Sequence, residues 1–324
     1  MFMMRFGMRA KTTTGPELAD LYRAAVEMCA WGESHGCIAA TLSEHHGSED
    51  GYLPSPVPLA AAIAARTSRL PINVAALMFL FYEPVKLAED MVIVDLLSRG
   101  RVSYVVGIGY RDEEFAMFGV DKRRRGALAE ERVRLLRRLF AGEEAEVDGR
   151  RARITPGPFT PGGPPIAGGG GTEAAARRAA RLGMLFLADR ADPGLETAYN
   201  DEAERAGVTP VGCVLPTEGV PLTVFVADDP DRAWAEIGEH LLVDAVGYGR
   251  WNADRAGVAS VSFATTVDEL KAEKGQYQIV TPDEAAVMLG KGMWLALQPL
   301  VGGIPPEVAW RYLEAAANVE ERPS

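Results

Sequence analysis

The sequence predicts an α/β protein folded as a (β/α)₈ barrel, a TIM barrel, over residues 1–324. Short apolar runs of strand length alternate with amphipathic segments of helix length, which indicates parallel strands joined by right-handed helical crossovers. Eight such strand candidates in a chain of 324 residues favour a closed barrel over an open doubly wound sheet. The open sheet remains the alternative, although "GIGYRD" and "GGGGTE" lack the complete glycine pattern of a dinucleotide or phosphate-binding loop.

The first half of the chain supplies four strand–helix units. Each predicted strand is a short apolar run, and each predicted helix has apolar residues three and four positions apart. Pro84 near the start and Gly100 at the end of one helix are ordinary boundary residues. The predicted strands are 5–10, 37–43, 70–80 and 101–110, and the helices are 17–36, 58–69, 84–100 and 125–140.

The alternation is interrupted once, at 143–163, where glycine and proline predict a loop or hairpin insertion after the fourth unit. It then resumes to the end of the chain, and Thr281 and Glu284 form a capping-box pattern before one of the later helices. The predicted strands are 164–171, 184–189, 221–228 and 294–302, and the helices are 172–183, 195–207, 229–251, 282–292 and 305–317.

Residues 257–280 have neither a helical nor a strand period. Long irregular segments in barrels commonly form lids over the active-site mouth. We therefore expect a mobile lid that becomes ordered with cofactor or substrate, and the alternative is a short helix at "VDELKAEK" fixed to the barrel wall. Trp251, Phe263 and Tyr277 would line a substrate pocket or anchor this segment.

Composition excludes several classes of function. The formal charge of −11 opposes binding to nucleic acid or to an anionic membrane, and no apolar run is long enough to span a bilayer. Cys29, Cys37 and Cys213 are odd in number and lack the spacing of a metal site. Together these features predict a protein of the reducing cytoplasm.

Three polar segments follow predicted strands directly: "SEHH" at 43–46, "GIGYRDEEF" at 107–115 and "GGGGTE" at 168–173. In a parallel barrel the carboxyl ends of all strands open on one face, so these segments should converge there. The glycine run opening into a helix, with the Thr172 hydroxyl, suits an anion. Gly107 and Gly109 would let a flat ligand lie against the backbone. The structural alternatives are a strand-to-helix turn capped by Thr172 and a tight barrel turn; together the features suggest a nucleotide-like cofactor.

The adjacent pair His45–His46 has three interpretations. A metal site would use both imidazoles with Glu44 or Asp50, but neighbouring strand residues point to opposite faces. A purely structural pair bonded within its loop is the second. A histidine that transfers protons is the third and the favoured one, because the imidazole titrates near neutral pH.

Several strings resemble the luciferase-like monooxygenase family: "SEHH", "AARTSRLPINVAALMF" and "YEPVKLAEDMVIVDLLSRGRVSYVVGIGYRDEEFAMFGVD". The pattern P-V-x-x-A-E-D followed by D-x-L-S-x-G-R is the most specific part. The resemblance implies a TIM barrel with an insertion after the fourth unit, and a cofactor that is reduced FMN or the deazaflavin F420. It also implies a homodimer, because members of the family usually dimerise.

The resemblance also implies site residues. Glu44 and His45 match the acid and the catalytic histidine that face the flavin ring. The bond between Ala75 and Ala76 matches a non-proline cis peptide beneath that ring, and Gly107 matches a small residue near its reactive part. The remaining matches are to the phosphate cradle, at Gly170, Gly171 and Thr172.

One position departs from the family pattern. Ile108 stands where many FMN users have an arginine that pairs with the phosphate, a bond worth about 1.5–3 kcal/mol. Arg111 or Arg177 would have to substitute for it. The departure suits F420, whereas "EHH" is more similar to the FMN users.

The favoured hypothesis is a two-component monooxygenase that receives reduced FMN from a separate flavin reductase and uses O₂ on a small or medium-sized organic substrate. His45 would handle protons in this reaction, and no metal is expected. The alternative is hydride transfer with F420. A non-catalytic flavin-binding protein and a metal-dependent barrel hydrolase are further hypotheses from other classes.

Overall fold

The computed structural model describes residues 1–12, 14–217, 219–255 and 257–319. Contacts between residues divide the chain into two compact units. The first unit comprises 1–43, 48–54 and the chain from 217 onward, and the second comprises 44–47 and 55–216. Each unit is an α/β structure in which the strands of the main sheet are parallel.

The first unit has a parallel sheet of order β12 (Leu295–Leu297), β1 (Phe2–Phe6) and β2 (Cys37–Leu42). A second parallel pair joins β10 (Thr223–Val226) to β11 (Tyr277–Val280). Phe2, Met4 and Phe6 alternate along β1 and are buried, which is why the first strand forms there.

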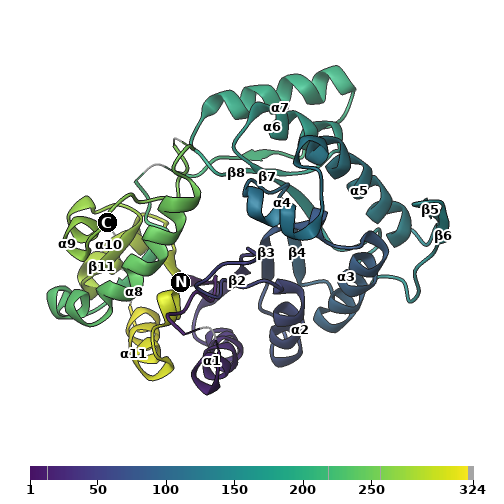
Figure 1. Cartoon of the computed structure of the whole chain (residues 1–324). Coiled ribbons are helices and arrows are strands. Elements are labelled where there is room, and N and C mark those ends of the chain that lie inside the picture. Colours follow the sequence, from purple (N-terminus) through teal and green to yellow (C-terminus); the bar gives the residue numbers. More distant parts are fainter. Residues whose placement is uncertain (13, 218, 256, 320–324) are drawn as a thin grey trace. The chain divides into compact units, whose positions relative to one another are not determined.

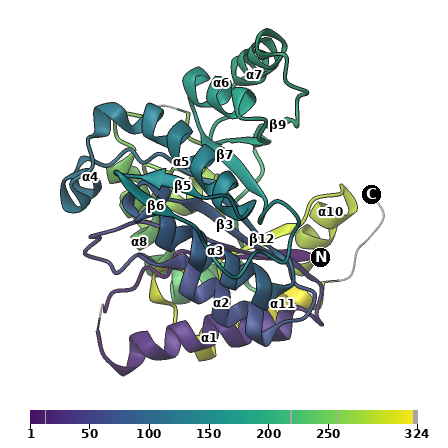
Figure 2. The ribbon, with the colours of Figure 1, turned by 90° about the vertical axis from the view of Figure 1, so that its right-hand side faces the viewer.

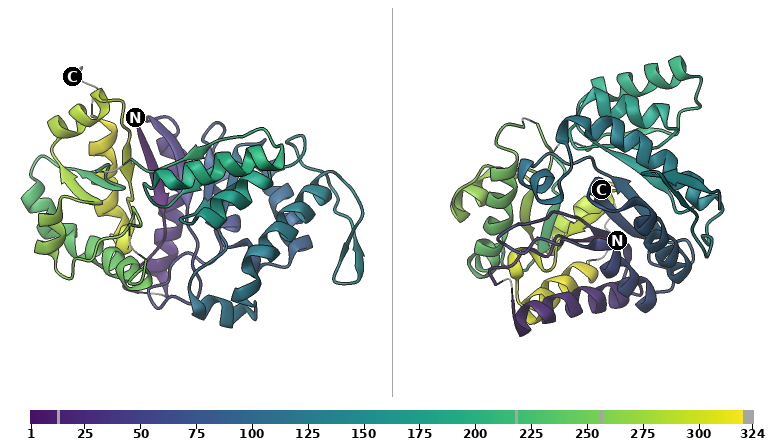
Figure 3. Two further views of the ribbon diagram at one scale, coloured as in Figure 1. Left: turned by 90° about the horizontal axis from the view of Figure 1, so that it is seen from above. Right: turned by 45° about the vertical axis from the view of Figure 1, so that its right-hand side comes forward.

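Helices cover these strands. They are α1 (Pro16–Gly32), α8 (Pro230–Trp251), α9 (Val267–Glu273), α10 (Pro282–Gly290) and α11 (Pro306–Ala317), with the 3₁₀ turn η3 (Val301–Gly303). In Figure 3, α1 in purple and α11 in yellow lie side by side. The predicted capping box begins α10: Thr281 accepts the Glu284 N–H and Glu284 accepts the Thr281 N–H.

The second unit contains a five-stranded parallel sheet of order β3 (Ile72–Leu77), β4 (Val102–Val106), β7 (Ile166–Gly170), β8 (Phe186–Ala188) and β9 (Cys213–Val214). Its helices are α2 (Pro56–Arg66), α3 (Pro84–Ser98), α4 (Asp112–Phe118), α5 (Arg125–Phe140), α6 (Glu173–Arg181) and α7 (Pro193–Ala206), with the turns η1 (Phe79–Phe81) and η2 (Lys122–Arg124). Figure 1 shows α6 beside α7, and Figure 2 shows α2 beside α3.

The glycine- and proline-rich stretch contains an antiparallel hairpin, β5 (Ala145–Val147) with β6 (Arg150–Ala152). The chain beyond the hairpin is fixed to α3, because the buried Asp95 carboxylate accepts both the N–H and the O–H of Thr160 at 2.7 Å. The Arg101 guanidinium donates to three carbonyls that follow or end α2, those of Ala64, Thr67 and Leu70. The string D-x-L-S-x-G-R thus fixes loops as well as ending a helix.

Two predictions about the elements are wrong. The first strand is 2–6 and not 5–10, because Met8 has a φ of 60° and cannot continue it. Residues 267–280 are not irregular, because they contain α9 and β11. The strand expected at 221–228 does form, as β10, and its partner is the unexpected β11. Helix α4 and strand β9 were also not predicted.

Helix α9 agrees with the alternative given for the lid segment. Thr266 caps it by accepting the Glu269 N–H, and Val267 packs so closely on α8 that a Cβ at Gly238 would lie 2.6 Å from its Cγ1. Lys271 is bonded to Asp231 at 2.6 Å. The irregular part of the segment is therefore confined to 257–266 within the described chain, and its mobility stays a prediction.

Candidate active site

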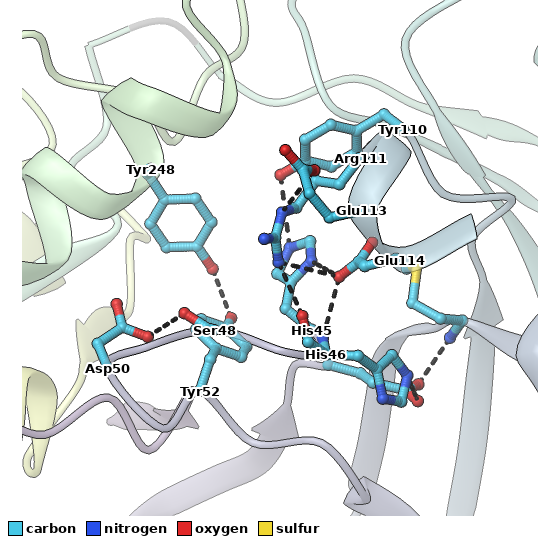
Figure 4. A network of polar contacts seen from close by, with 12 residues as sticks. His45, His46, Ser48, Asp50, Tyr52, Tyr110, Arg111, Glu113, Glu114 and Tyr248 are labelled. Carbon is cyan, nitrogen blue, oxygen red and sulfur yellow. Dashed lines mark hydrogen bonds and ion pairs between the residues drawn. The ribbon is translucent and has the colours of Figure 1, made fainter. Parts of the chain in front are cut away.

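A cluster of buried polar side chains in the second unit gathers around the two adjacent histidines (Figure 4). We call it the histidine cluster; its members are Glu44, His45, His46, Tyr110, Arg111 and Glu114. The histidines follow β2, whereas Tyr110 and Arg111 precede α4 and Glu114 lies in its first turn. Glu44, His45, His46 and Glu114 are each less than 9% exposed, so the cluster is largely removed from solvent.

His45 is held by Glu114. Its Nδ1 lies 2.9 Å from Glu114 Oε1, and the same oxygen accepts the His46 N–H at 2.9 Å and the Arg111 guanidinium at 3.3 Å. Burial acts to raise the pKa of Glu114, but the bonds from His45, the His46 amide and Arg111 outweigh it and hold that pKa below the ordinary 4.5. Glu114 is therefore ionised near neutral pH and accepts a hydrogen bond from the Nδ1–H group, which leaves Nε2 of a neutral His45 as the basic nitrogen.

The second nitrogen of His45 faces a phenol. The Tyr110 hydroxyl lies 3.4 Å from His45 Nε2, and the two rings meet edge to face with their centroids 5.6 Å apart. Arg111 supports the same loop by donating to the His46 carbonyl at 3.0 Å. One nitrogen of the ring is thus fixed by a short bond to a carboxylate, whereas the bond from the Tyr110 hydroxyl to the other nitrogen is long.

Glu44 has a different set of contacts. Its carboxylate is 1% exposed and accepts the Met78 N–H at 2.6 Å and the Tyr82 O–H at 2.7 Å. His46 Nε2 lies 2.8 Å from Glu44 Oε1, at ion-pair distance but without the geometry of a hydrogen bond. Burial, and then the Glu44 carboxylate, raise the pKa of Tyr82, so the phenol stays a donor. These contacts tie the end of β3 to the histidine loop.

The end of β3 has the feature implied by the resemblance: the Ala75–Ala76 peptide bond is cis, and the register of β3 on β4 shifts between Ala75 and Leu77. Gly107 lies opposite, and a Cβ there would approach Met78 Cε to 2.5 Å and the Ala76 Cβ to 3.0 Å. A larger residue at 107 would therefore displace the Met78 methyl group and crowd Ala76, so the packing favours the small residue expected there.

The glycine run enters α6 as expected. Gly170 has a φ of 150°, and the Thr172 hydroxyl caps α6 by accepting the Ala175 N–H at 3.2 Å. A Cβ at Gly171 would lie 1.9 Å from Asp189 Oδ1 and 2.8 Å from Arg190 Nε, so both side chains rest against this turn. The first amides of α6 have no partner within the helix, which leaves donors for an anion.

A small cavity lies beside this turn and is lined by Ile108, Val133, Gly168, Gly169 and Arg178. The Arg178 guanidinium is packed against Gly126, and its buried Nε has no hydrogen-bond partner. Burial lowers the pKa of Arg178. Arg178 is therefore the cation in the lining that also contains Ile108, whereas Arg177 pairs with Glu173 at 3.1 Å.

A second buried polar cluster lies in the first unit; we call it the arginine cluster, composed of Arg9, Asp50, Tyr52, Asp244, Tyr248 and Trp251. Arg9 is 1% exposed, pairs with Asp50 and lies 2.9 Å from Asp244. Its guanidinium lies 4.0 Å from the centroid of Trp251. Asp244 also accepts the O–H of the buried Tyr277 at 2.8 Å, so Trp251 and Tyr277 are anchoring residues, while Phe263 is 62% exposed.

The model of the family described as luciferase-like monooxygenase matches residues 2–288. The chain belongs to this family. The resemblance found in the sequence is thereby confirmed.

Members of the luciferase-like family similar to this chain include the alkanal monooxygenase alpha chain of Photorhabdus luminescens, 26% identical over 188 residues, which are 56% of this chain and 52% of the relative. The F420-dependent glucose-6-phosphate dehydrogenase of Mycobacterium avium (strain 104) is 30% identical over 176 residues, 51% of this chain and 52% of the relative. The chain thus spans about half the length of these curated relatives.

Solved structures with the same fold cover nearly the whole chain. A monooxygenase from Streptomyces bottropensis superposes with a TM-score of 0.72 at 23% identity, over 98% of both chains. The oxygenating constituent of 3,6-diketocamphane monooxygenase from Pseudomonas putida, a type II Baeyer-Villiger monooxygenase in complex with FMN, has a TM-score of 0.69 at 18% identity and covers 100% of this chain and 99% of its own.

The expected site residues lie in three places in the second unit. Glu44 and His45 are in the histidine cluster. Ala75 and Ala76 lie at the end of β3 with Gly107 opposite them. The turn into α6 is formed by Gly170, Gly171 and Thr172. Two members of the cluster were not singled out from the sequence, Tyr110 and Glu114. Both residues belong to the string "GIGYRDEEF", which the sequence places at the end of a strand. Nothing in this string by itself distinguishes its tyrosine and its second glutamate from the other polar residues.

Within the described ranges of the chain, no helix combines the length and the apolar character needed to cross a bilayer. Among the same residues, no three His, Cys, Asp or Glu side chains are grouped so that they could hold a metal ion.

Proposed function

We propose that the chain is a reduced-flavin-dependent monooxygenase that receives FMNH₂ from a separate reductase and acts with O₂ on a small or medium-sized organic substrate. The carrying observation is the 2.9 Å contact between His45 Nδ1 and Glu114, whose pKa is lowered, because this contact would leave Nε2 of the neutral ring as a basic nitrogen. A base of this kind near neutral pH suits proton transfer. The FMN complex of a structural neighbour and the monooxygenases among the relatives support this choice.

The residues of the α6 turn fit the phosphate of FMN. The Arg178 Nε is a buried donor without a hydrogen-bond partner. Arg190 Nε also has no hydrogen bond, but it lies against Gly171 and 3.7 Å from Asp189 Oδ1. Asp189, which follows β8 and rests against the same turn, opposes a dianion, so the two arginines would have to outweigh it. Arg178 is therefore a better substitute for the arginine missing at 108 than Arg111, which is bonded to Glu114, or Arg177. Bound reduced FMN would supply the electrons for oxygen chemistry.

The protein's part is to position groups and to hold a proton. His45 would accept or return a proton at Nε2, with Glu114 stabilising the charge that forms on the ring. Glu44 would act as a positioning residue and not as a catalytic one, because both of its oxygens are occupied by Met78, Tyr82 and His46. It holds the residues that follow the Ala75–Ala76 bond, where the resemblance places the ring of the cofactor.

The second candidate is hydride transfer with F420. It is supported by the F420-dependent relative and by Ile108, which removes one cation from the phosphate region. A closed (β/α)₈ barrel over 1–324, a homodimer and a location in the cytoplasm belong to the same proposal. They are supported by the parallel strand order within each unit and by the resemblance to the family.

Anaerobic titration of the purified protein with reduced FMN, reduced F420 and reduced riboflavin tests the proposal. We expect FMN to bind more tightly than F420, and preferential binding of F420 would reverse the order of the two candidates. Arg178→Gln should weaken FMN at least about tenfold, the loss of one charge-assisted bond, and leave riboflavin binding unchanged. Arg177→Gln is the matched control on the same helix.

A further inference from the structure

We propose that Tyr110 is a positioning residue for His45: its phenol donates to Nε2 and keeps the neutral ring in the Nδ1–H form until a ligand bonds to Nε2. This inference rests on the proposed function, in which His45 handles protons. It adds a residue that neither the sequence pattern nor the similarity to other proteins assigned to the site.

The ring of His45 is constrained from both sides. Glu114 binds Nδ1 at 2.9 Å from the first turn of α4, and the Tyr110 hydroxyl approaches Nε2 from the residues that precede the same helix. The ionised Glu114 selects the tautomer with its proton on Nδ1. Nε2 then carries a lone pair and no proton, so in the contact between Tyr110 and Nε2 only the phenol can donate. The bond from Nδ1 to Glu114 therefore sets the direction of the bond from Tyr110 to Nε2.

Contacts to its backbone hold Tyr110 in place. The Lys122 ammonium donates to the Tyr110 carbonyl at 2.7 Å and pairs with Asp112. Gly109 precedes it with a φ of 74°, and a Cβ at Gly109 would approach the Phe115 ring to 3.1 Å. The turn therefore directs the tyrosine ring toward His45, and replacing the hydroxyl alone should leave this backbone unchanged.

The bond between the Tyr110 hydroxyl and His45 Nε2 is long. Its oxygen–nitrogen distance of 3.4 Å exceeds the usual 2.7–3.2 Å, so it is weaker than the 2.9 Å bond between His45 Nδ1 and Glu114. A substrate or cofactor group that bonds to Nε2 can displace the phenol at small cost. His45 is only 6% exposed, and the Tyr110 hydroxyl gives its buried Nε2 a hydrogen-bond donor in the free protein. Tyr110 thus binds the nitrogen that would exchange the proton during the reaction.

Long-range ¹H–¹⁵N NMR of the histidine side chains in the flavin-free protein tests the contact directly. We expect the wild-type spectrum to show a protonated Nδ1 and a hydrogen-bonded imine Nε2 for His45. In Tyr110→Phe, Nε2 should shift toward the value of a free imine nitrogen while Nδ1 stays protonated. Tyr52→Phe, which removes a buried hydroxyl bonded to Tyr248 in the first unit, should leave both His45 signals unchanged.

Turnover with reduced flavin supplies the second readout. Tyr110→Phe should lower kcat/KM roughly three- to tenfold, the effect of one neutral hydrogen bond that orients the ring in the free protein. The kcat should stay nearly unchanged, because a ligand that bonds to Nε2 has already displaced the phenol. An unchanged Nε2 signal in Tyr110→Phe, or a wild-type ring protonated on Nε2, would overturn the proposal. Absence of turnover in the wild type would instead contradict the proposed function, because the NMR result is obtained without cofactor.

Discussion

The arginine cluster of the first unit and the histidine cluster of the second unit both bury charge, but they leave different groups available. Arg9 is 1% exposed, is flanked by two acids and is covered by the rings of Tyr52, Tyr248 and Trp251. A guanidinium stays protonated at any ordinary pH, so this cluster has no proton to exchange.

The histidine cluster contains an imidazole, a side-chain group that can exchange a proton, with a short bond on one nitrogen and a long one on the other. Burial of charge is therefore not by itself a sign of chemistry. A site needs a group that changes state and a contact weak enough to be exchanged. The arginine cluster should therefore govern stability, and the histidine cluster activity.

Replacing His45 should give the largest effect. His45→Ala should fold and lose about two to four orders of magnitude in kcat, the usual range for a missing acid–base group. His46→Ala should retain more activity and lose more stability, because His46 contacts Glu44, Phe81 and Phe118. Steady-state kinetics together with urea unfolding measure both quantities, and the reverse ranking would exchange the roles of the two histidines.

Removing the cation of the arginine cluster should give the largest loss of stability. Arg9→Met leaves Asp50 and Asp244 without their partner, which costs about 3–5 kcal/mol when such charges are buried. Urea unfolding followed by circular dichroism measures the loss. Arg123→Met is the control, because that side chain is 91% exposed. Equal stability of the two variants would show that the arginine cluster does not hold the first unit together.

The Glu114 carboxylate should make stability depend on pH. Its pKa is lower in the folded protein than the ordinary 4.5, so its contribution is complete above about pH 4.5 and is lost as the pH falls through the lower folded value. The free energy of unfolding of the wild type should exceed that of Glu114→Gln by about 1–3 kcal/mol at pH 7. This difference should shrink steadily below pH 4.5; a difference constant from pH 7 to pH 3 would contradict the ionised Glu114.

The smallest effect should come from one hydroxyl of the arginine cluster. Tyr52→Phe removes the 2.5 Å contact between the Tyr52 and Tyr248 hydroxyls and should cost about 1 kcal/mol of stability with no change in kcat. Tyr110→Phe should show the opposite pattern, a lower kcat/KM with nearly unchanged stability. The pair of variants differs only in which cluster loses a hydroxyl, so similar effects of both on kcat/KM would remove the distinction between the clusters.

Much of the fold could be predicted because it depends on local pattern. The helices at 84–98 and 125–140 begin and end within two residues of their predicted bounds, since their apolar spacing and boundary residues act within the segment. Residues 267–280 could not be predicted in this way. Helix α9 is too short to show a period, and β11 is a strand because β10 pairs with it.

The α/β alternation, the family and the place of "SEHH" at the end of a strand all follow from the sequence alone. The pairing of each acid with its histidine depends instead on the tertiary structure. Glu44 is adjacent to His45 in the chain, yet it turns to Met78, Tyr82 and His46, whereas His45 takes Glu114, 69 positions away. Neighbouring residues on an extended chain point in opposite directions, so sequence proximity separates such side chains and the partner must come from another element.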